Sequence, residues 1–166
     1  MSNRVFVLME DGLNEPEWFS KIEPFLNSVM EKLNFSNEEV SVMFSSDSFI
    51  KALNFQYRNI DSPTDVLSFE NDLEYEDGEK WKNVGDIVIS LETLSKNAEY
   101  FEVSENLELK RLLIHGLLHL NGYDHGEEHI EKNKEPECEM LKIQENLLKE
   151  FEDFTIIDSL RLQEKL

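Results

Sequence analysis

The densest group of reactive side chains in this sequence is the stretch HGLLHLNGYDH, which holds three of the chain's four histidines. His115 and His119 are four residues apart, so on a helix both imidazoles lie on one face, with Cβ atoms about 5–6 Å apart. Gly122 can adopt the left-handed conformation that ends a helix, and the chain can then turn back toward the same face. His125 can therefore approach the other two. The pattern H-x-x-x-H-x-x-G-x-x-H predicts that three imidazoles bind one metal ion.

The composition of this ligand set indicates an ion that takes part in chemistry. A closed structural zinc site has four protein ligands, usually with cysteines among them, whereas three histidines leave a position open for water. Zn²⁺ lowers the pKa of bound water to about 7, which makes hydroxide available at neutral pH. We therefore expect one Zn²⁺ per chain, bound by His115, His119 and His125. The alternative, that the histidines merely pack in the core, explains three imidazoles at this spacing poorly.

The residue after the first histidine distinguishes between classes of hydrolase. Metzincin metalloproteases share the histidine spacing, but their motif begins H-E-x-x-H, and its glutamate is the general base of peptide hydrolysis. Gly116 stands at that position here. The missing carboxylate argues against proteolysis, and it leaves the charge of a zinc ion without a neighbouring negative group. Such a site suits an anionic substrate, for example a phosphodiester.

The charge of the whole chain limits how a polyanion can bind. The 166 residues include 36 acidic and 16 basic ones, which gives a net charge of −20. A surface of this charge repels polyanions at long range, so a nucleic acid must be met by a local positive site. The length and the 40 % of hydrophobic residues fit one domain with its own core.

Cysteine content and hydropathy indicate where the protein works. Cys138 is the only cysteine, so no internal disulfide can form, and a reducing compartment fits. No stretch approaches the roughly 20 apolar residues of a membrane span. The apolar part of the first residues is too short for a signal peptide. We expect a cytoplasmic protein with no membrane partner.

Hydrophobic periodicity predicts the elements that must position the histidines. Four short apolar runs predict strands, over residues 4–9, 39–44, 64–69 and 86–90. Apolar residues at helical spacing predict helices, from about 15 to 33, 47 to 58, 91 to 101, 106 to 122 and 131 to 151. The helix that carries His115 and His119 is apolar on nearly every face, so we expect it to be buried.

The mixture of strands and helices along the chain predicts an α+β fold. We expect a single domain with a small mixed four-stranded sheet, about five or six helices packed on it, and a metzincin-like metal-binding helix and turn. This domain is assigned to residues 1–152, and residues 153–166 are predicted to form a C-terminal tail. The acidic insert 70–83 is predicted to be a long, solvated hairpin connection, and we assign no role to it.

Three blocks of sequence together resemble the YbeY endoribonucleases, a bacterial family of metal-dependent factors that process ribosomal RNA. HGLLHLNGYDH is similar to the signature of this family. LNFQYRNIDSPTDVLSFE, residues 53–70, resembles its second signature, in which an Asn and a Tyr-Arg pair lead into PTDVLSF. VGDIVIS, residues 84–90, resembles its third. The blocks have the family's order and separation, so the resemblance covers roughly residues 40–150.

The resemblance implies a zinc-dependent hydrolase of single-stranded RNA that acts in ribosome maturation and quality control, chiefly on 16S ribosomal RNA. Implied partners are the small ribosomal subunit and its assembly factors, and no DNA is expected. The family's metal-binding histidines fall on His115, His119 and His125, and its essential arginine falls on Arg58. A guanidinium can hold a phosphate through two parallel hydrogen bonds and stabilise its growing negative charge. Lys51, on the same predicted helix as Arg58, could add a second positive charge for binding RNA.

Several polar residues near these blocks have more than one possible role. Asp124 either holds a ligand imidazole in its tautomer or forms a turn. Asp65 and Asp86 are predicted to be structural, capping or turn groups, and Ser68 is a candidate hydroxyl lining the site. His129 stands among glutamates and is interpreted as a surface residue, or else as a neighbour of the site. The identity of the general base is left open, because a metal-bound hydroxide can act without one.

Two other functions stay open at this point. The first is a ribosome-assembly or RNA-binding factor whose metal site is mainly structural. The second is a metalloprotease-like hydrolase, which Gly116 disfavours. An RNA cleavage assay with and without a chelator separates the enzyme from the assembly factor.

Overall fold

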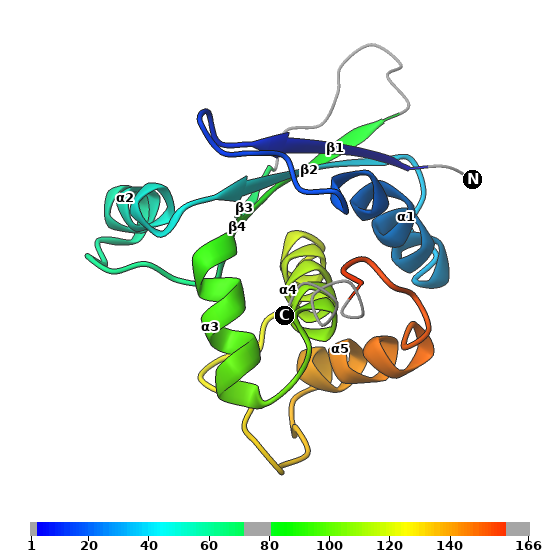
Figure 1. Ribbon diagram of the computed structural model, residues 1–166. Helices are drawn as coiled ribbons and strands as arrows, with labels where there is room; N and C mark the ends of the chain where they lie inside the picture. The colour runs from blue at the N-terminus through cyan, green and yellow to red at the C-terminus, as the bar shows by residue number, and fades with distance from the viewer. Residues whose placement is uncertain (1–2, 72–80, 159–166) are drawn as a thin grey trace.

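The computed structural model describes residues 3–71 and 81–158 (Figure 1). Most of the acidic insert 70–83 lies outside these ranges, and so does the end of the predicted tail. The prediction of a solvated hairpin connection in the insert is therefore not tested. Among the described residues, no helix combines the length and hydropathy that a membrane span needs.

A mixed four-stranded sheet forms one layer of the molecule (Figure 1). Its strands are β1 (Arg4–Met9), β2 (Glu38–Ser45), β3 (Val66–Glu70) and β4 (Lys82–Ser90). Their order is β1-β2-β4-β3; β1, β2 and β4 are parallel, and β3 runs antiparallel to β4. The small mixed sheet predicted from the sequence is confirmed.

Helices pack on one face of the sheet and at one of its ends (Figure 1). They are the short 3₁₀ turn η1 (Phe19–Lys21), α1 (Ile22–Lys32), α2 (Asp47–Arg58), α3 (Leu91–Phe101), α4 (Glu105–Leu120) and α5 (Glu139–Glu150). α4 lies centrally beneath the sheet, with α1, α3 and α5 around it. α2 packs separately, through Ile50, on Leu67 of β3 and Val88 of β4. The predicted single α+β domain is therefore confirmed.

The main core lies between the sheet and α4. Alternate residues of β2 are buried, as expected of a strand with one face on the core. The inward residues of α4 are fully buried, among them Leu109, Leu113, Ile114 and Leu117. This confirms that the histidine helix is a buried one, which fixes the backbone from which the imidazoles project.

Gly116 brings α4 very close to β4. A Cβ atom built on Gly116 would lie 2.9 Å from Cγ2 of Ile87 and 3.0 Å from its Cδ1. Such distances are too short for carbon atoms in contact, so a side chain at position 116 would require the side chain of Ile87 to shift. The packing therefore explains why this helix lacks the glutamate of the metzincin motif at this position.

Two helices begin later than the sequence analysis predicted, in each case because of a proline. α1 begins at Ile22 and not near residue 15, which leaves Pro24 in the first turn, where a missing N–H costs nothing. α5 begins at Glu139 and not near residue 131, because Pro136 disfavours helical backbone before it. Cys138 precedes α5 with extended backbone angles.

The described part of the predicted tail, residues 153–158, lies against the core. Ile156 and Ile157 are buried, and Phe154 packs on Phe25 with a ring-centroid separation of 5.2 Å. The ammonium of Lys110, buried in α4, donates to the carbonyl oxygens of Phe151 and Phe154, each at 2.9 Å. The domain boundary at residue 152 stays a prediction, which stability measurements can test.

Replacing Ile156 with alanine should lower the free energy of unfolding by about 2–5 kcal/mol, the usual cost of truncating a buried isoleucine. The matched control is Thr155→Ala, because Thr155 is exposed and adjacent. Surface substitutions of that kind usually change stability by less than about 0.5 kcal/mol. Urea denaturation followed by circular dichroism measures both. Equal, small effects would mean that residues after 152 contribute little to the folded domain.

Candidate active site

The C-terminal half of α4 and the turn that follows it position the histidines. Ser104 caps the helix, and its hydroxyl accepts a hydrogen bond from the backbone N–H of Leu107. The helix ends at Leu120, after which Gly122 takes a left-handed φ of +89°. The chain then turns back, as the glycine spacing predicts, and presents His125 to the end of α4.

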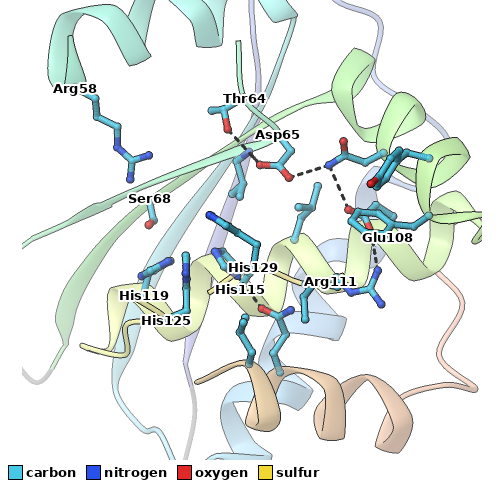
Figure 2. Close-up of a pocket in the computed structure, with 18 residues that line it drawn as sticks. Arg58, Thr64, Asp65, Ser68, Glu108, Arg111, His115, His119, His125 and His129 are labelled. Atoms are coloured by element: carbon cyan, nitrogen blue, oxygen red, sulfur yellow. Dashed lines mark hydrogen bonds and ion pairs between the residues drawn. The ribbon is translucent and has the colours of Figure 1, made fainter. Parts of the chain in front are cut away.

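The structure brings the three predicted imidazoles together (Figure 2). Ring centroids are 4.7 Å apart for His115 and His119, 5.1 Å for His115 and His125, and 5.2 Å for His119 and His125. One ring nitrogen from each lies within 4.8 Å of the other two, so a single ion could be held by all three. His115, His119 and His125 therefore form a possible metal-binding triad.

Hydrogen bonds leave one nitrogen of each α4 imidazole available to an ion. Nδ1 of His115 donates to Oε1 of Gln144 at 2.8 Å, and Nδ1 of His119 donates to the carbonyl oxygen of Tyr123 at 3.1 Å. Both partners are acceptors, so the hydrogen is on Nδ1 and the lone pair of Nε2 is left for a metal. Nδ1 of His125 is buried and has no hydrogen-bond partner among the described residues. The donor set therefore fits a divalent ion.

The electrostatics of the triad favour neutral rings. Burial is the main reason why the pKa of His115 is lowered to about 4; the charges of His119 and His125 act in the same sense, against the hydrogen bond with Gln144, which raises it. Burial also lowers the pKa of His119, helped by the charge of His125. Both α4 imidazoles are consequently neutral at pH 7, which is the form that coordinates a metal.

The triad forms one wall of a cavity of about 420 Å³. Other walls come from the end of α2, β3, α3 and α5, and from the loop after α4. The polar residues among them are Arg58, Thr64, Asp65, Ser68, Asn97, Tyr100, Glu108, Arg111, His129 and Gln144. Segments that are far apart in the chain are thus joined around one space.

A family model described as Endoribonuclease YbeY matches residues 8–152. The chain belongs to this family. A YbeY endoribonuclease of Treponema denticola is 49 % identical over 161 residues, which cover 94 % of this chain and 98 % of the relative. A relative with the same name from Treponema pallidum is 45 % identical, over 88 % of this chain and 88 % of its own length. Another, from Borreliella burgdorferi, is 42 % identical, over 76 % of this chain and 82 % of its own length. The resemblance of the three sequence blocks is confirmed.

A solved structure also resembles this YbeY chain. The solution structure of TM1509 from Thermotoga maritima superposes with a TM-score of 0.60 at 30 % sequence identity. The match covers 90 % of this chain and 91 % of the other. The α+β architecture is therefore shared with a protein whose structure is known by experiment.

Arg58 of this YbeY protein is placed across the cavity from the triad. It is the last residue of α2, which ends because Asn59 takes a left-handed φ of +58°. Figure 2 shows the exposed Arg58 side chain reaching from α2 toward Ser68 and the histidines. Lys51 of the same helix does not line the cavity; its ammonium lies 3.8 Å from a carboxylate oxygen of Asp61.

The two candidate aspartates nearest the blocks have distinct surroundings. Asp65 lines the cavity, where its Oδ1 accepts from the backbone N–H of Val66 at 2.8 Å, as expected of a capping group. Asp86 lies within β4, on its outer face beside a separate groove, so it is neither a capping nor a turn group. Burial raises the pKa of Asp86, against a hydrogen bond with Ser41 that lowers it.

The loop after α4 holds the remaining candidates. The Asp124 carboxylate accepts a hydrogen bond from the backbone N–H of Gly126 at 3.1 Å, and this bond is the main reason why its pKa is lowered. Asp124 thus makes a turn, one of its two predicted roles. His129 is exposed and lines the cavity, with its ring centroid 5.4 Å from that of His125. It is a surface residue and also a neighbour of the triad.

The sequence analysis missed a network of polar side chains behind the triad. It consists of Asn97, Glu108, Arg111, Gln144 and Glu145. Glu108 and Arg111 left a signal, because together with Lys110 they interrupt the apolar residues of this helix. Gln144 and Glu145 left little, because polar residues are common on the exposed faces of a helix such as α5.

Proposed function

We propose that this chain is a zinc-dependent endoribonuclease that cleaves single-stranded RNA. The observation that supports this best is the triad of His115, His119 and His125, with neutral α4 imidazoles, on one side of a cavity that has Arg58 on the other. One zinc ion bound by the three imidazoles would supply the Lewis acidity that activates water for hydrolysis. The other requirements, binding and charge stabilisation of the phosphate, fall to the protein.

Arg58 is the group that we assign to the phosphate. Two arginines line the described part of the cavity, and Arg111 is paired with the carboxylates of Glu108 and Glu145. The exposed guanidinium of Arg58 can instead form two parallel hydrogen bonds to phosphate oxygens. Its charge stabilises the negative charge that grows on these oxygens during cleavage. The hydroxyl of Ser68 is a further candidate donor.

The substrate that we propose is ribosomal RNA, in particular 16S ribosomal RNA during maturation and quality control of the small subunit in the cytoplasm. Two points support a single strand. The cavity of about 420 Å³ is of the size that takes a small ligand or a nucleotide, and it is too small for a base-paired helix. With a net charge of −20, the chain is also poorly suited to bind a long duplex by charge alone.

A structural metal in an RNA-binding factor is the second candidate function. It fits the triad less well, because structural zinc sites are closed by four protein ligands. Here three imidazoles border a cavity that Arg58, the group we assign to the phosphate, also lines. A peptidase fits least, because Gly116 packs on Ile87 and leaves no room for a base at that position.

The zinc-loaded protein should cut single-stranded ribosomal RNA fragments, and a chelator should stop the reaction until zinc is restored. Casein and peptide libraries should stay intact under the same conditions, because the triad lacks the base of the metalloproteases. Gel analysis of labelled RNA and peptide mapping measure the two activities. Metal-dependent peptide cleavage would overturn the assignment, and RNA binding without cleavage would favour the assembly factor.

A further inference from the structure

We infer that Arg111 and Glu145 are positioning residues for the metal ligand His115. They act through the side-chain amide of Gln144, whose orientation decides which ring nitrogen of His115 carries the hydrogen. The inference rests on the proposed metal site and adds the part of the protein that prepares one ligand for it. It concerns four side chains on α4 and α5.

The amide of Gln144 can face the imidazole in two ways. In the structure Oε1 accepts from Nδ1–H of His115 at 2.8 Å, so Nε2 of the ring is free to bind an ion. A flipped amide would present its NH₂ group, and Nδ1 would then have to accept. The ring hydrogen would move to Nε2, which is the atom that the metal needs. Gln144 is 1 % exposed, so water cannot readily replace either contact.

Glu145 selects between these orientations. Its Oε2 accepts from Nε2 of Gln144 at 3.0 Å. A carboxylate has no hydrogen to donate, so it binds the NH₂ group and rejects the amide oxygen. The NH₂ group is thereby held on the side away from the ring. The acceptor-only chemistry of Glu145 thus places the amide oxygen toward His115.

Arg111 holds the carboxylate of Glu145 in place. Its Nε donates to Oε2 at 3.1 Å and its Nη2 donates to Oε1 at 3.0 Å, a two-pronged pair that fixes the plane of the carboxylate. Its Nη1 donates to Oε1 of Glu108 at 2.8 Å, so a buried carboxylate of α4 holds the arginine in turn. Glu145 therefore accepts from both sides, from Arg111 and from the amide of Gln144, whose oxygen in turn accepts from His115.

Glu108, which binds Nη1 of Arg111, is itself linked by hydrogen bonds toward the sheet. Nδ2 of Asn97 lies 3.4 Å from Oε2 of Glu108 and 2.8 Å from Oδ2 of Asp65. Asp65 in turn accepts from the backbone at the start of β3. The side chain of Glu108 is only 2 % exposed and that of Arg111 13 %, so this arrangement is held away from solvent. Hydrogen-bonded side chains from α3, α4 and α5, and from Asp65 just before β3, thus hold the arginine in place.

Glu145→Gln is the test, because it keeps the shape of the side chain and removes its acceptor-only character. An amide at 145 can donate to Oε1 of Gln144, so the flipped orientation is no longer excluded. We expect zinc affinity to fall about 10- to 100-fold, the usual effect of losing a group that orients a metal ligand. Competition with a chromophoric chelator measures the affinity. Nitrogen NMR of the metal-free protein should show a fraction of His115 with hydrogen on Nε2.

The exchanged variant Gln144→Glu/Glu145→Gln again presents an acceptor-only group to Nδ1 of His115. A carboxylate at 144 accepts from His115, and an amide at 145 donates to that carboxylate. Its net charge equals that of the original protein, so we expect zinc affinity and the Nδ1–H tautomer to return. A purely structural role of Glu145 predicts no such recovery. Arg111 is a poorer site for the test, because its removal leaves Glu108 buried without its cation.

The matched control is Glu150→Gln, the same change on the same helix. Glu150 pairs with Lys32 at 3.2 Å near the surface, with side-chain exposures of 47 % and 56 %, so zinc affinity should not change. Unaltered affinity and tautomer in Glu145→Gln, or a folded exchanged variant that does not recover, would overturn the inference. If the original protein binds no zinc, the proposed function fails, while the tautomer measurement still decides the role of Glu145.

Discussion

Replacing Arg58 with alanine should lower RNA cleavage by at least about 100-fold, the usual cost of losing a preorganised group that stabilises transition-state charge. Zinc content and melting temperature should hardly change. The side chain is exposed at the end of α2, and charged groups in such positions contribute less than about 1 kcal/mol to stability. Single-turnover cleavage of labelled RNA, zinc analysis and thermal unfolding measure the three quantities.

Two variants sharpen this test. Arg58→Lys should restore little activity, because an ammonium cannot form the planar two-pronged contact with a phosphate. Lys51→Ala is the matched control, because Lys51 lies on the same helix, is exposed and does not line the cavity. It should keep nearly full activity. Near-normal cleavage by the lysine variant would mean that Arg58 contributes only its positive charge. An unfolded alanine variant would mean that the role of the residue is structural.

The second large effect concerns the metal. The purified protein should contain one tightly bound divalent ion, and the double variant His115→Ala/His119→Ala should contain none. Zinc at 100 times its dissociation constant should stabilise the original protein by about 2.7 kcal/mol, since it binds only the folded state. The double variant should not respond. Elemental analysis and melting curves with added zinc measure both effects.

The control for this experiment is His129→Ala. His129 neighbours the triad but is not one of the three imidazoles whose nitrogens lie within 4.8 Å of one another, so its removal should leave the metal content unchanged. Equal metal in the original protein and the double variant would rule out the triad as the binding site. Loss of metal in His129→Ala would mean that a fourth imidazole takes part.

The triad could be predicted because its geometry is local. A spacing of four residues on a helix and a glycine at its end suffice to gather three imidazoles, whatever the rest of the fold does. Arg58 is different. Nothing in residue spacing places the end of α2 across from α4, and only the family resemblance indicated it.

What the sequence analysis missed depends on long-range packing or on a misjudged signal. Gln144 meets His115 only because α5 packs on α4, and no periodicity in either helix reveals that contact. The late starts of α1 and α5 were readable in principle, because Pro24 and Pro136 are tolerated only in the first turn or outside a helix. Helical spacing of apolar residues was given more weight than these prolines.

The contact between Gly116 and Ile87 also makes the two positions dependent on each other in evolution. A mutation that placed a glutamate after the first histidine would put its Cβ 2.9 Å from the side chain of Ile87, which would have to shift at a cost in core packing. A smaller residue at position 87 would make room for the glutamate. While position 116 is still glycine, however, that smaller residue leaves a cavity in the core, which lowers stability. Each single step is therefore unfavourable alone. This epistasis separates the present site from a peptidase, although the two share the spacing of their histidines.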